Sequence, residues 1–301
     1  MTGAPATSLT TVHAGPTMRL ERAADLPIAR LVLARPPANE IGLASLVDLE
    51  AVVAYAEASD LRALIIQSEL ASAFSAGADL RELQRDFAAH HGAGGERAEA
   101  VAEVRRFLDR IHAVMDALDL LPLTTIAALH GAVFGGGFEL ALACDLRVAD
   151  QSTRFSFPEL RLGLVPGWGG TVRLAREAPQ GLVRDLLLTG RTLGAQRAYD
   201  LGLVSQLVPR GEAPMAAWRM AEQCARFTPA AVRAAKRLTK TVDRAALEAE
   251  KQAFADLFAI DGEGGGPVLR ALTTFVTTSD KRPYLPPSSP SADQALPKEA
   301  R

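Results

Sequence analysis

The sequence predicts an α/β protein with a mainly helical C-terminal part. Short apolar segments of strand length alternate with segments whose apolar residues recur at helical spacing, which is typical of parallel strands joined by helices. After residue 181 helical patterns dominate. The composition agrees with a folded chain, because 48% of its 301 residues are hydrophobic and 23% are charged.

The predicted elements follow one another in a regular order. Residues 28–33 form an apolar run that Arg35-Pro36-Pro37 ends, so we expect a strand there. Residues 43–59 have helical spacing and predict a helix. The same reasoning predicts a strand at 63–67, a loop at 74–79, helices from Leu80 and over 101–118, a strand at 125–129, a helical stretch at 140–143 and a strand at 146–149.

The second part of the chain is predicted to be helical. Helices are expected over 182–189, 195–201, 216–227, 230–239 and 244–259, with a last one ending near Thr277. The Val-Pro-Arg-Gly break at 208–211 suggests a boundary near residue 210. We therefore predict a core over 18–210 and a helical domain over 211–285. Residues 1–17 and 286–301 are expected to be loose tails because of their Thr/Ala/Gly/Pro-rich and Pro/Ser-rich compositions.

Charge and cysteine content exclude several classes of protein. The 33 basic residues nearly balance 35 acidic ones, so nothing favours a nucleic-acid or anionic-membrane partner. Two cysteines, Cys144 and Cys224, exclude a disulfide framework. No histidine has the His-Glu-x2-His spacing, so no metal is expected. The chain shows neither a secretory signal pattern nor an apolar run of ~20 residues, which predicts a cytoplasmic protein without a membrane partner.

A glycine-rich segment gives the strongest local signal. Three consecutive glycines, Gly135 to Gly137, precede an apolar helical stretch within residues 131–140 (GAVFGGGFEL). Glycines let the backbone approach a ligand, and a helix start offers N–H groups to an anion. That anion could be a phosphate, although the P-loop pattern is absent, or an enolate-type oxyanion. A tight turn with glycines for packing remains the alternative.

Two other segments carry chemically useful residues. Residues 74–80 (FSAGADL) form a loop of small residues that opens a helix, and Asp79 alone would read as a helix-start residue. Glu159 follows Phe157-Pro158 in an apolar setting, and Glu139 has similar surroundings. Burial would raise the pKa of both carboxyl groups and suit acid–base work, whereas solvent exposure is the ordinary outcome for a single glutamate.

Taken together and in this order, the segments resemble the enoyl-CoA hydratase/isomerase (crotonase) superfamily. The resemblance covers about residues 19–285 and is carried by residues 73–80 (AFSAGADL), 131–145 (GAVFGGGFELALACD), 157–174 (FPELRLGLVPGWGGTVRL) and 191–204 (RTLGAQRAYDLGLV). It implies a spiral of repeated ββα units, completed by a C-terminal helical segment that assembles a homotrimer or a dimer of trimers.

The resemblance also implies an acyl-CoA thioester substrate and no cofactor. The oxyanion-hole N–H groups map to Ala78 and Gly136, where donors would face the charge that develops on the thioester oxygen. Glu139 would take a proton from the water that attacks C3, and Glu159 would deliver a proton to C2. Other substrate-binding positions that it implies are Ala76, Asp79, Leu80, Arg81, Gly135, Pro158, Gly167 and Trp168.

The presence of both glutamates favours hydration of a 2-enoyl-CoA to a 3-hydroxyacyl-CoA. An enoyl-CoA isomerase that uses Glu159 alone is the alternative on the same scaffold. A non-catalytic member, for example an RNA-binding one, is the alternative of another class, and the near-neutral charge argues against it. Trp168 stands where the family often has a small residue, which predicts a reshaped acyl pocket.

Overall fold

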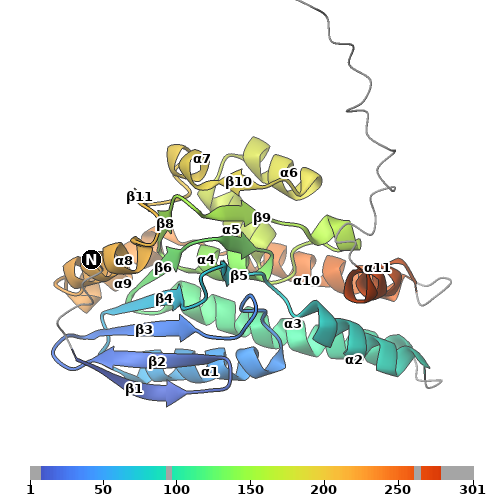
Figure 1. Cartoon of the computed structure of the whole chain (residues 1–301), viewed down its shortest axis with the longest axis horizontal. Helices are drawn as coiled ribbons and strands as arrows, with labels where there is room; N and C mark the ends of the chain where they lie inside the picture. Colours follow the sequence, from blue (N-terminus) through green and yellow to red (C-terminus); the bar gives the residue numbers. More distant parts are fainter. Residues whose placement is uncertain (1–7, 93–96, 261–265, 279–301) are drawn as a thin grey trace, which may run out of the picture.

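The computed structural model describes residues 8–92, 97–260 and 266–278, which form two sheets surrounded by helices (Figure 1). The larger sheet has seven strands, in the order β1 (Leu9–Ala14), β2 (Met18–Ala23), β3 (Ile28–Leu33), β4 (Ala63–Ser68), β6 (Thr124–Leu129), β8 (Leu146–Asp150) and β11 (Gln206–Val208). The smaller sheet has four, in the order β10 (Leu193–Gly194), β9 (Arg154–Ser156), β7 (Ala132–Phe134) and β5 (Ala73–Ser75).

Within the described residues, a ββα unit occurs three times in succession. Strands β4 and β5 lead to α2 (Leu80–Gly92) and α3 (Arg97–Leu120), and β6 and β7 lead to α4 (Gly136–Ala143). Strands β8 and β9 lead to the 3-10 helix η1 (Glu159–Leu162) and α5 (Gly170–Glu177). The first strand of each unit belongs to the large sheet, where β4, β6 and β8 pair in parallel. The second strand belongs to the small sheet, where β5, β7 and β9 pair in parallel. This arrangement confirms the predicted α/β spiral.

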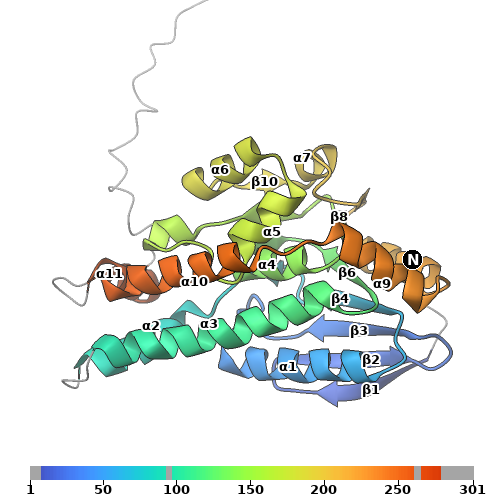
Figure 2. The ribbon, with the colours of Figure 1, turned by 180° about the vertical axis from the view of Figure 1, so that it is seen from behind.

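Helices cover both faces of the large sheet. The remaining helices are α1 (Leu43–Ala58), α6 (Gln180–Thr189), α7 (Ala195–Asp200), α8 (Ala213–Cys224), α9 (Pro229–Thr239), α10 (Arg244–Ala259) and α11 (Gly266–Thr277). Alternate residues of the buried strands face opposite sides, so Leu64 and Ile66 join the main core whereas Ala63 and Ile65 pack with Trp218 of α8. Figure 2 shows α1 and α3 over the opposite face. Helix α8, beyond residue 210, thus shares a core with the sheet.

The N-terminal segment is more ordered than its composition predicts. The expectation of a loose tail over 1–17 is wrong from Leu9 onward, because β1 pairs antiparallel with β2. Asp48 of α1 accepts hydrogen bonds from the backbone N–H and the hydroxyl of Thr17, at 3.1 and 2.7 Å. The overlooked signal is a run of strand-forming residues, Leu9 to His13, followed by a Gly15-Pro16 turn. Residues 1–7 and 286–301 lie outside the described residues.

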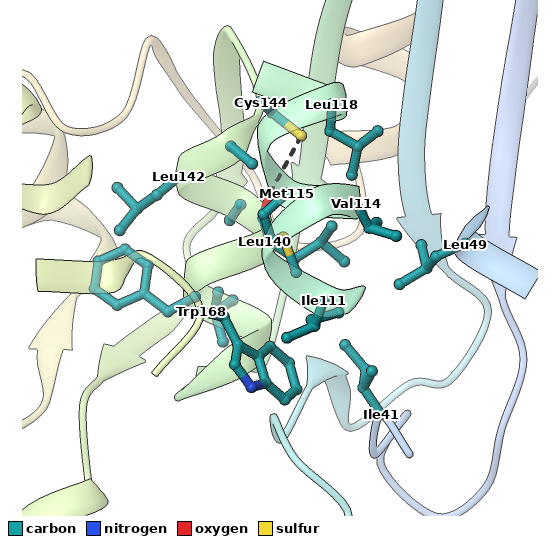
Figure 3. Close-up of a cluster of buried hydrophobic side chains, with 14 of the residues drawn as sticks. Ile41, Leu49, Ile111, Val114, Met115, Leu118, Leu140, Leu142, Cys144 and Trp168 are labelled. Atoms are coloured by element: carbon teal, nitrogen blue, oxygen red, sulfur yellow. Dashed lines mark hydrogen bonds between the residues drawn. The ribbon is translucent and has the colours of Figure 1, made fainter. Parts of the chain in front are cut away.

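A buried apolar cluster fixes α4 against α3. Ile111 and Met115 of α3 pack with Leu140 of α4, and Trp168 lies at the edge of this cluster (Figure 3). Cys144 belongs to the cluster and donates to the Leu140 carbonyl oxygen at 3.5 Å. Burial raises the pKa of the Cys144 thiol to about 12, so this cysteine is protonated and packs as a core side chain. Among the helices of the described ranges, none has the length and apolar character that a membrane crossing needs.

Candidate active site

The start of α4 brings together two of the three sequence segments. Gly135 has a φ of 50°, a left-handed conformation that favours glycine, and its N–H donates to the Ser156 carbonyl oxygen of β9. A Cβ atom on Gly135 would lie 2.6 Å from the Glu159 carboxyl oxygen Oε1. The glycine therefore permits both the turn into α4 and the close approach of Glu159.

The loop after β5 meets the same turn. A Cβ atom on Gly77 would lie 2.9 Å from the Gly136 nitrogen, so the two loops touch through their backbones. Ile41 anchors the loop by donating to the Gly77 carbonyl at 2.7 Å and accepting from the Asp79 N–H at 3.0 Å. Among the described residues, neither the Ala78 N–H nor the Gly136 N–H has an acceptor. The two predicted oxyanion-hole donors thus lie at neighbouring backbone turns, and neither N–H is bonded to another described residue.

Glu139 lies in the first turn of α4 and is buried. Its Oε1 accepts hydrogen bonds from the backbone N–H groups of Trp168 and Gly170, at 2.8 and 2.7 Å. Burial, together with the nearby carboxyl groups of Glu250 and Glu159, raises the pKa of Glu139 well above its usual range. The two N–H donors oppose this shift because they stabilise the ionised form.

Glu159 begins η1 and has a different environment. Its Oε2 is buried and has no hydrogen-bond partner in the part of the chain that the structure describes. Burial raises the pKa of Glu159 to about 8, with a further contribution from Glu250. The backbone N–H of Glu159 itself opposes this rise. Because Glu139 accepts two backbone donors and the buried Oε2 of Glu159 accepts none, the two carboxyl groups have unequal hydrogen bonding. The site can therefore offer one base and one acid.

A third buried carboxyl group, from Glu250 of α10, was missed by the sequence analysis. Its Oε1 accepts from the Gly169 N–H at 2.5 Å, and its Oε2 accepts from the Thr171 N–H at 2.8 Å. A signal was available, because Glu250 occupies the same helical stripe as the buried Leu247 and Phe254. A charged residue at such a position requires partners that the sequence does not reveal.

Two further residues hold the segment around Trp168. The ring N–H of His112 (Nε2) donates to the Gly167 carbonyl oxygen at 2.7 Å, and burial lowers the pKa of His112 to about 4, so the ring is neutral. Arg173 is buried, pairs with Asp119 and donates to the Trp168 carbonyl oxygen at 2.9 Å. Within the described ranges, no three His, Cys, Asp or Glu side chains are grouped to hold a metal ion.

A cavity of about 530 Å³ opens beside Ala78. Ala78, Asp79 and Trp168 line it, together with apolar side chains that include Leu83, Phe87, Val104, Phe107, Leu108 and Phe254. Glu139, Glu159 and Gly136 are not among its lining residues. Trp168 explains the separation, because a Cβ atom on Gly136 would lie 1.9 Å from the indole ring. The indole thus forms the wall between the cavity and the start of α4.

The structure assigns local contacts to the other predicted substrate-binding residues. Asp79 caps α2 by accepting from the N–H groups of Arg81 and Glu82, both at 3.0 Å, and it also pairs with Arg35. The side chain of Arg81 is exposed and pairs with Glu40 at 3.2 Å. Six of the predicted substrate-binding positions do not line the cavity: Ala76, Leu80, Arg81, Gly135, Pro158 and Gly167.

Comparison with known proteins identifies the family. The model of the enoyl-CoA hydratase/isomerase family matches residues 24–266. The chain belongs to this family. Methylglutaconyl-CoA hydratase, mitochondrial, of Rattus norvegicus is 39% identical over 191 residues, which cover 62% of this chain and 56% of the relative. This chain therefore spans little more than half the length of that relative. Enoyl-CoA hydratase domain-containing protein 2, mitochondrial, of Bos taurus is 36% identical over 237 residues, which cover 78% of this chain and 75% of the relative.

Solved structures of the enoyl-CoA hydratase/isomerase family share the fold. An enoyl-CoA hydratase from Bacillus anthracis is 30% identical with a TM-score of 0.64, covering 89% of this chain and 96% of its own. An enoyl-CoA hydratase/isomerase from Xanthobacter autotrophicus Py2 is 26% identical with a TM-score of 0.72, covering 88% of this chain and 94% of its own.

Trp168→Ala is expected to widen the acyl preference of this family member. Removing the buried indole joins the cavity to the space beside Gly136, at a cost to folding of about 3–5 kcal/mol. We expect kcat/KM to rise for branched or bulky 2-enoyl-CoA thioesters relative to the straight four-carbon thioester crotonyl-CoA. Competition between the two thioesters measures the ratio of their kcat/KM values. Trp218→Ala controls for destabilisation, because it removes a buried tryptophan that packs on the opposite face of the large sheet, with Ala63 and Ile65. An unchanged ratio would show that the indole does not shape the acyl site.

Proposed function

We propose that this protein is a 2-enoyl-CoA hydratase, which adds water across the 2,3 double bond to give a 3-hydroxyacyl-CoA. The observation that carries the proposal is a buried pair of carboxyl groups with unequal hydrogen bonding. Glu139 accepts two backbone donors, whereas Glu159 has a buried oxygen without a partner among the described residues. This pair lies beside the Ala78 and Gly136 amides, which can hold a thioester oxygen.

In the proposed reaction, the two backbone amides and the two glutamates each have one role. The thioester oxygen accepts hydrogen bonds from Ala78 and Gly136 N–H, which stabilise the enolate charge. Glu139 takes a proton from water as its oxygen bonds to C3, and Glu159 gives its proton to C2. One water is consumed and no electrons are transferred, so the addition balances without a cofactor. Transfer of the proton from Glu139 to Glu159 restores the starting state.

The cavity supports an uncharged, apolar acyl group. Its inner lining is aromatic and aliphatic, from α2, α3, Trp168 and Phe254. Its charged lining residues are Asp79, Glu82, Asp86, Glu103, Arg106 and Arg110, so acidic groups outnumber basic ones by four to two.

The test is the loss of enoyl-thioester absorbance with crotonyl-CoA and with a longer 2-enoyl-CoA. Rapid loss with at least one thioester, and a 3-hydroxyacyl-CoA product, is the expected result. No loss with any 2-enoyl-CoA would refute the hydratase proposal. Salt-dependent binding of RNA by a protein that turns over no thioester would instead favour the non-catalytic alternative.

We also propose a homo-oligomer, a trimer or a dimer of trimers, in which α9 packs on another subunit. Helix α9 has no buried residue, and Leu238 at its end is 83% exposed. Leu238→Glu is expected to lower the mass measured by light scattering toward that of one chain, with secondary structure unchanged because the side chain is exposed within a subunit. A wild-type mass of one chain would contradict the proposal. The cytoplasmic location stays a prediction, and several relatives are named as mitochondrial.

A further inference from the structure

Successive backbone N–H groups from Trp168 to Thr171 donate alternately to two different carboxyl groups. The N–H groups of Trp168 and Gly170 donate to Glu139, and those of Gly169 and Thr171 donate to Glu250. The φ of 93° at Gly169 belongs to the left-handed region and lets successive N–H groups face different side chains. Four consecutive amides are therefore shared between a glutamate of α4 and one of α10.

Glu250 lies among hydrogen-bond donors and close to a cation. It is buried, and both of its carboxyl oxygens accept hydrogen bonds, including a short one from the Thr171 hydroxyl. Burial raises the pKa of Glu250, whereas these donors and the nearby guanidinium of Arg173 lower it. Three donors and a neighbouring cation favour the ionised carboxylate.

The geometry points to Glu250 as a positioning residue for Glu139, and this inference rests on the proposed hydratase function. By holding the Gly169 and Thr171 amides, Glu250 turns the Trp168 and Gly170 amides toward Glu139. Its negative charge also disfavours ionisation of Glu139 and so makes Glu139 a stronger base. The other ionisable groups around this pair are Glu159 from η1, Arg173 from α5 and His112 from α3, which is bound to Gly167.

Glu250→Gln tests the electrostatic part of this role. The amide keeps the size of the side chain, loses the charge, and presents an NH₂ group that cannot accept from Thr171. We expect kcat to fall about 10- to 100-fold with little change in KM, because the lost contact acts on the base and not on the thioester. The acidic limb of the kcat/KM profile should move to lower pH by about one pH unit. Glu248→Gln, on the same helix but exposed and paired with Lys251, should change neither quantity.

An infrared titration separates this inference from the hydratase proposal. The carboxyl stretch of Glu139 is assigned by its loss in Glu139→Gln and is then titrated in wild type and in Glu250→Gln. The inference predicts that Glu139 ionises at lower pH in Glu250→Gln, whether or not the protein hydrates thioesters. Thr171→Val, which removes one donor from Glu250, should shift the titration in the same direction if Glu250→Gln does not fold, and Thr171→Ser should restore it. An unchanged Glu139 titration in a folded variant would overturn the inference, even with hydration intact.

Discussion

Replacing Glu139 with glutamine is expected to lower kcat for hydration of a 2-enoyl-CoA by about 10²- to 10⁴-fold. The amide cannot take a proton from water, but its oxygen can still accept from the Trp168 and Gly170 N–H groups. The fold and thioester binding should therefore be kept, which thermal unfolding and the Kd for a product thioester would verify. The rate is measured from the loss of enoyl-thioester absorbance at saturating substrate.

The outcome of this substitution also separates hydratase from isomerase. An isomerase that uses Glu159 alone would keep its rate of double-bond migration from a 3-enoyl-CoA in Glu139→Gln. A hydratase loses its main activity. Undiminished hydration in Glu139→Gln would contradict the assignment of Glu139 as the base.

Replacing Glu159 with glutamine is expected to lower kcat by a similar factor, because glutamine has no acidic proton to give to C2. The pKa of about 8 at Glu159 adds a pH dependence, since the proton is present below this value and lost above it. Wild-type kcat should accordingly fall as the pH rises through about 8. A wild-type kcat that stays level well above pH 8 would argue against Glu159 as the acid.

The same substitution should stabilise the fold at alkaline pH. The pKa of Glu159 is higher in the folded state, about 8, than in the unfolded state, near 4.5. The neutral carboxyl group therefore contributes stability at low pH. This contribution is lost as the pH rises from about 4.5 to about 8. Glutamine stays neutral at every pH. We therefore compare the free energy of unfolding of Glu159→Gln with that of wild type. The variant's advantage should be about 1–3 kcal/mol larger at pH 9 than at pH 5. Denaturant unfolding at both values measures this difference. An equal difference at both pH values would indicate that Glu159 is ionised throughout.

Periodicity predicted the long elements of the fold and missed the short ones. The helix expected over 43–59 and the strand expected over 28–33 match α1 and β3 within a residue. Strands β5, β7 and β9 have three residues each, too few for an alternating pattern, although they form most of the small sheet. Helix α5 was missed because it begins on a glycine and has eight residues.

The candidate site was predicted only where its residues lie in recognisable segments. Glu139 and Glu159 came from local apolar settings together with the family resemblance, and their burial agrees with the expected surroundings. Glu250 contacts Gly169 across 81 positions of the chain, and His112 contacts Gly167 across 55. Such contacts depend on how α10 and α3 pack, which a single sequence does not encode in any local pattern.

In the proposed reaction, water adds to a 2-enoyl thioester under the control of Glu139 and Glu159. The most direct measurement is the mass of the product formed from crotonyl-CoA in ¹⁸O-labelled water. We expect a CoA thioester heavier than the substrate by one labelled water, with the label on C3, and far less of it with either glutamine variant. A product of unchanged mass, or free CoA without the 3-hydroxyacyl thioester, would contradict the proposed hydration.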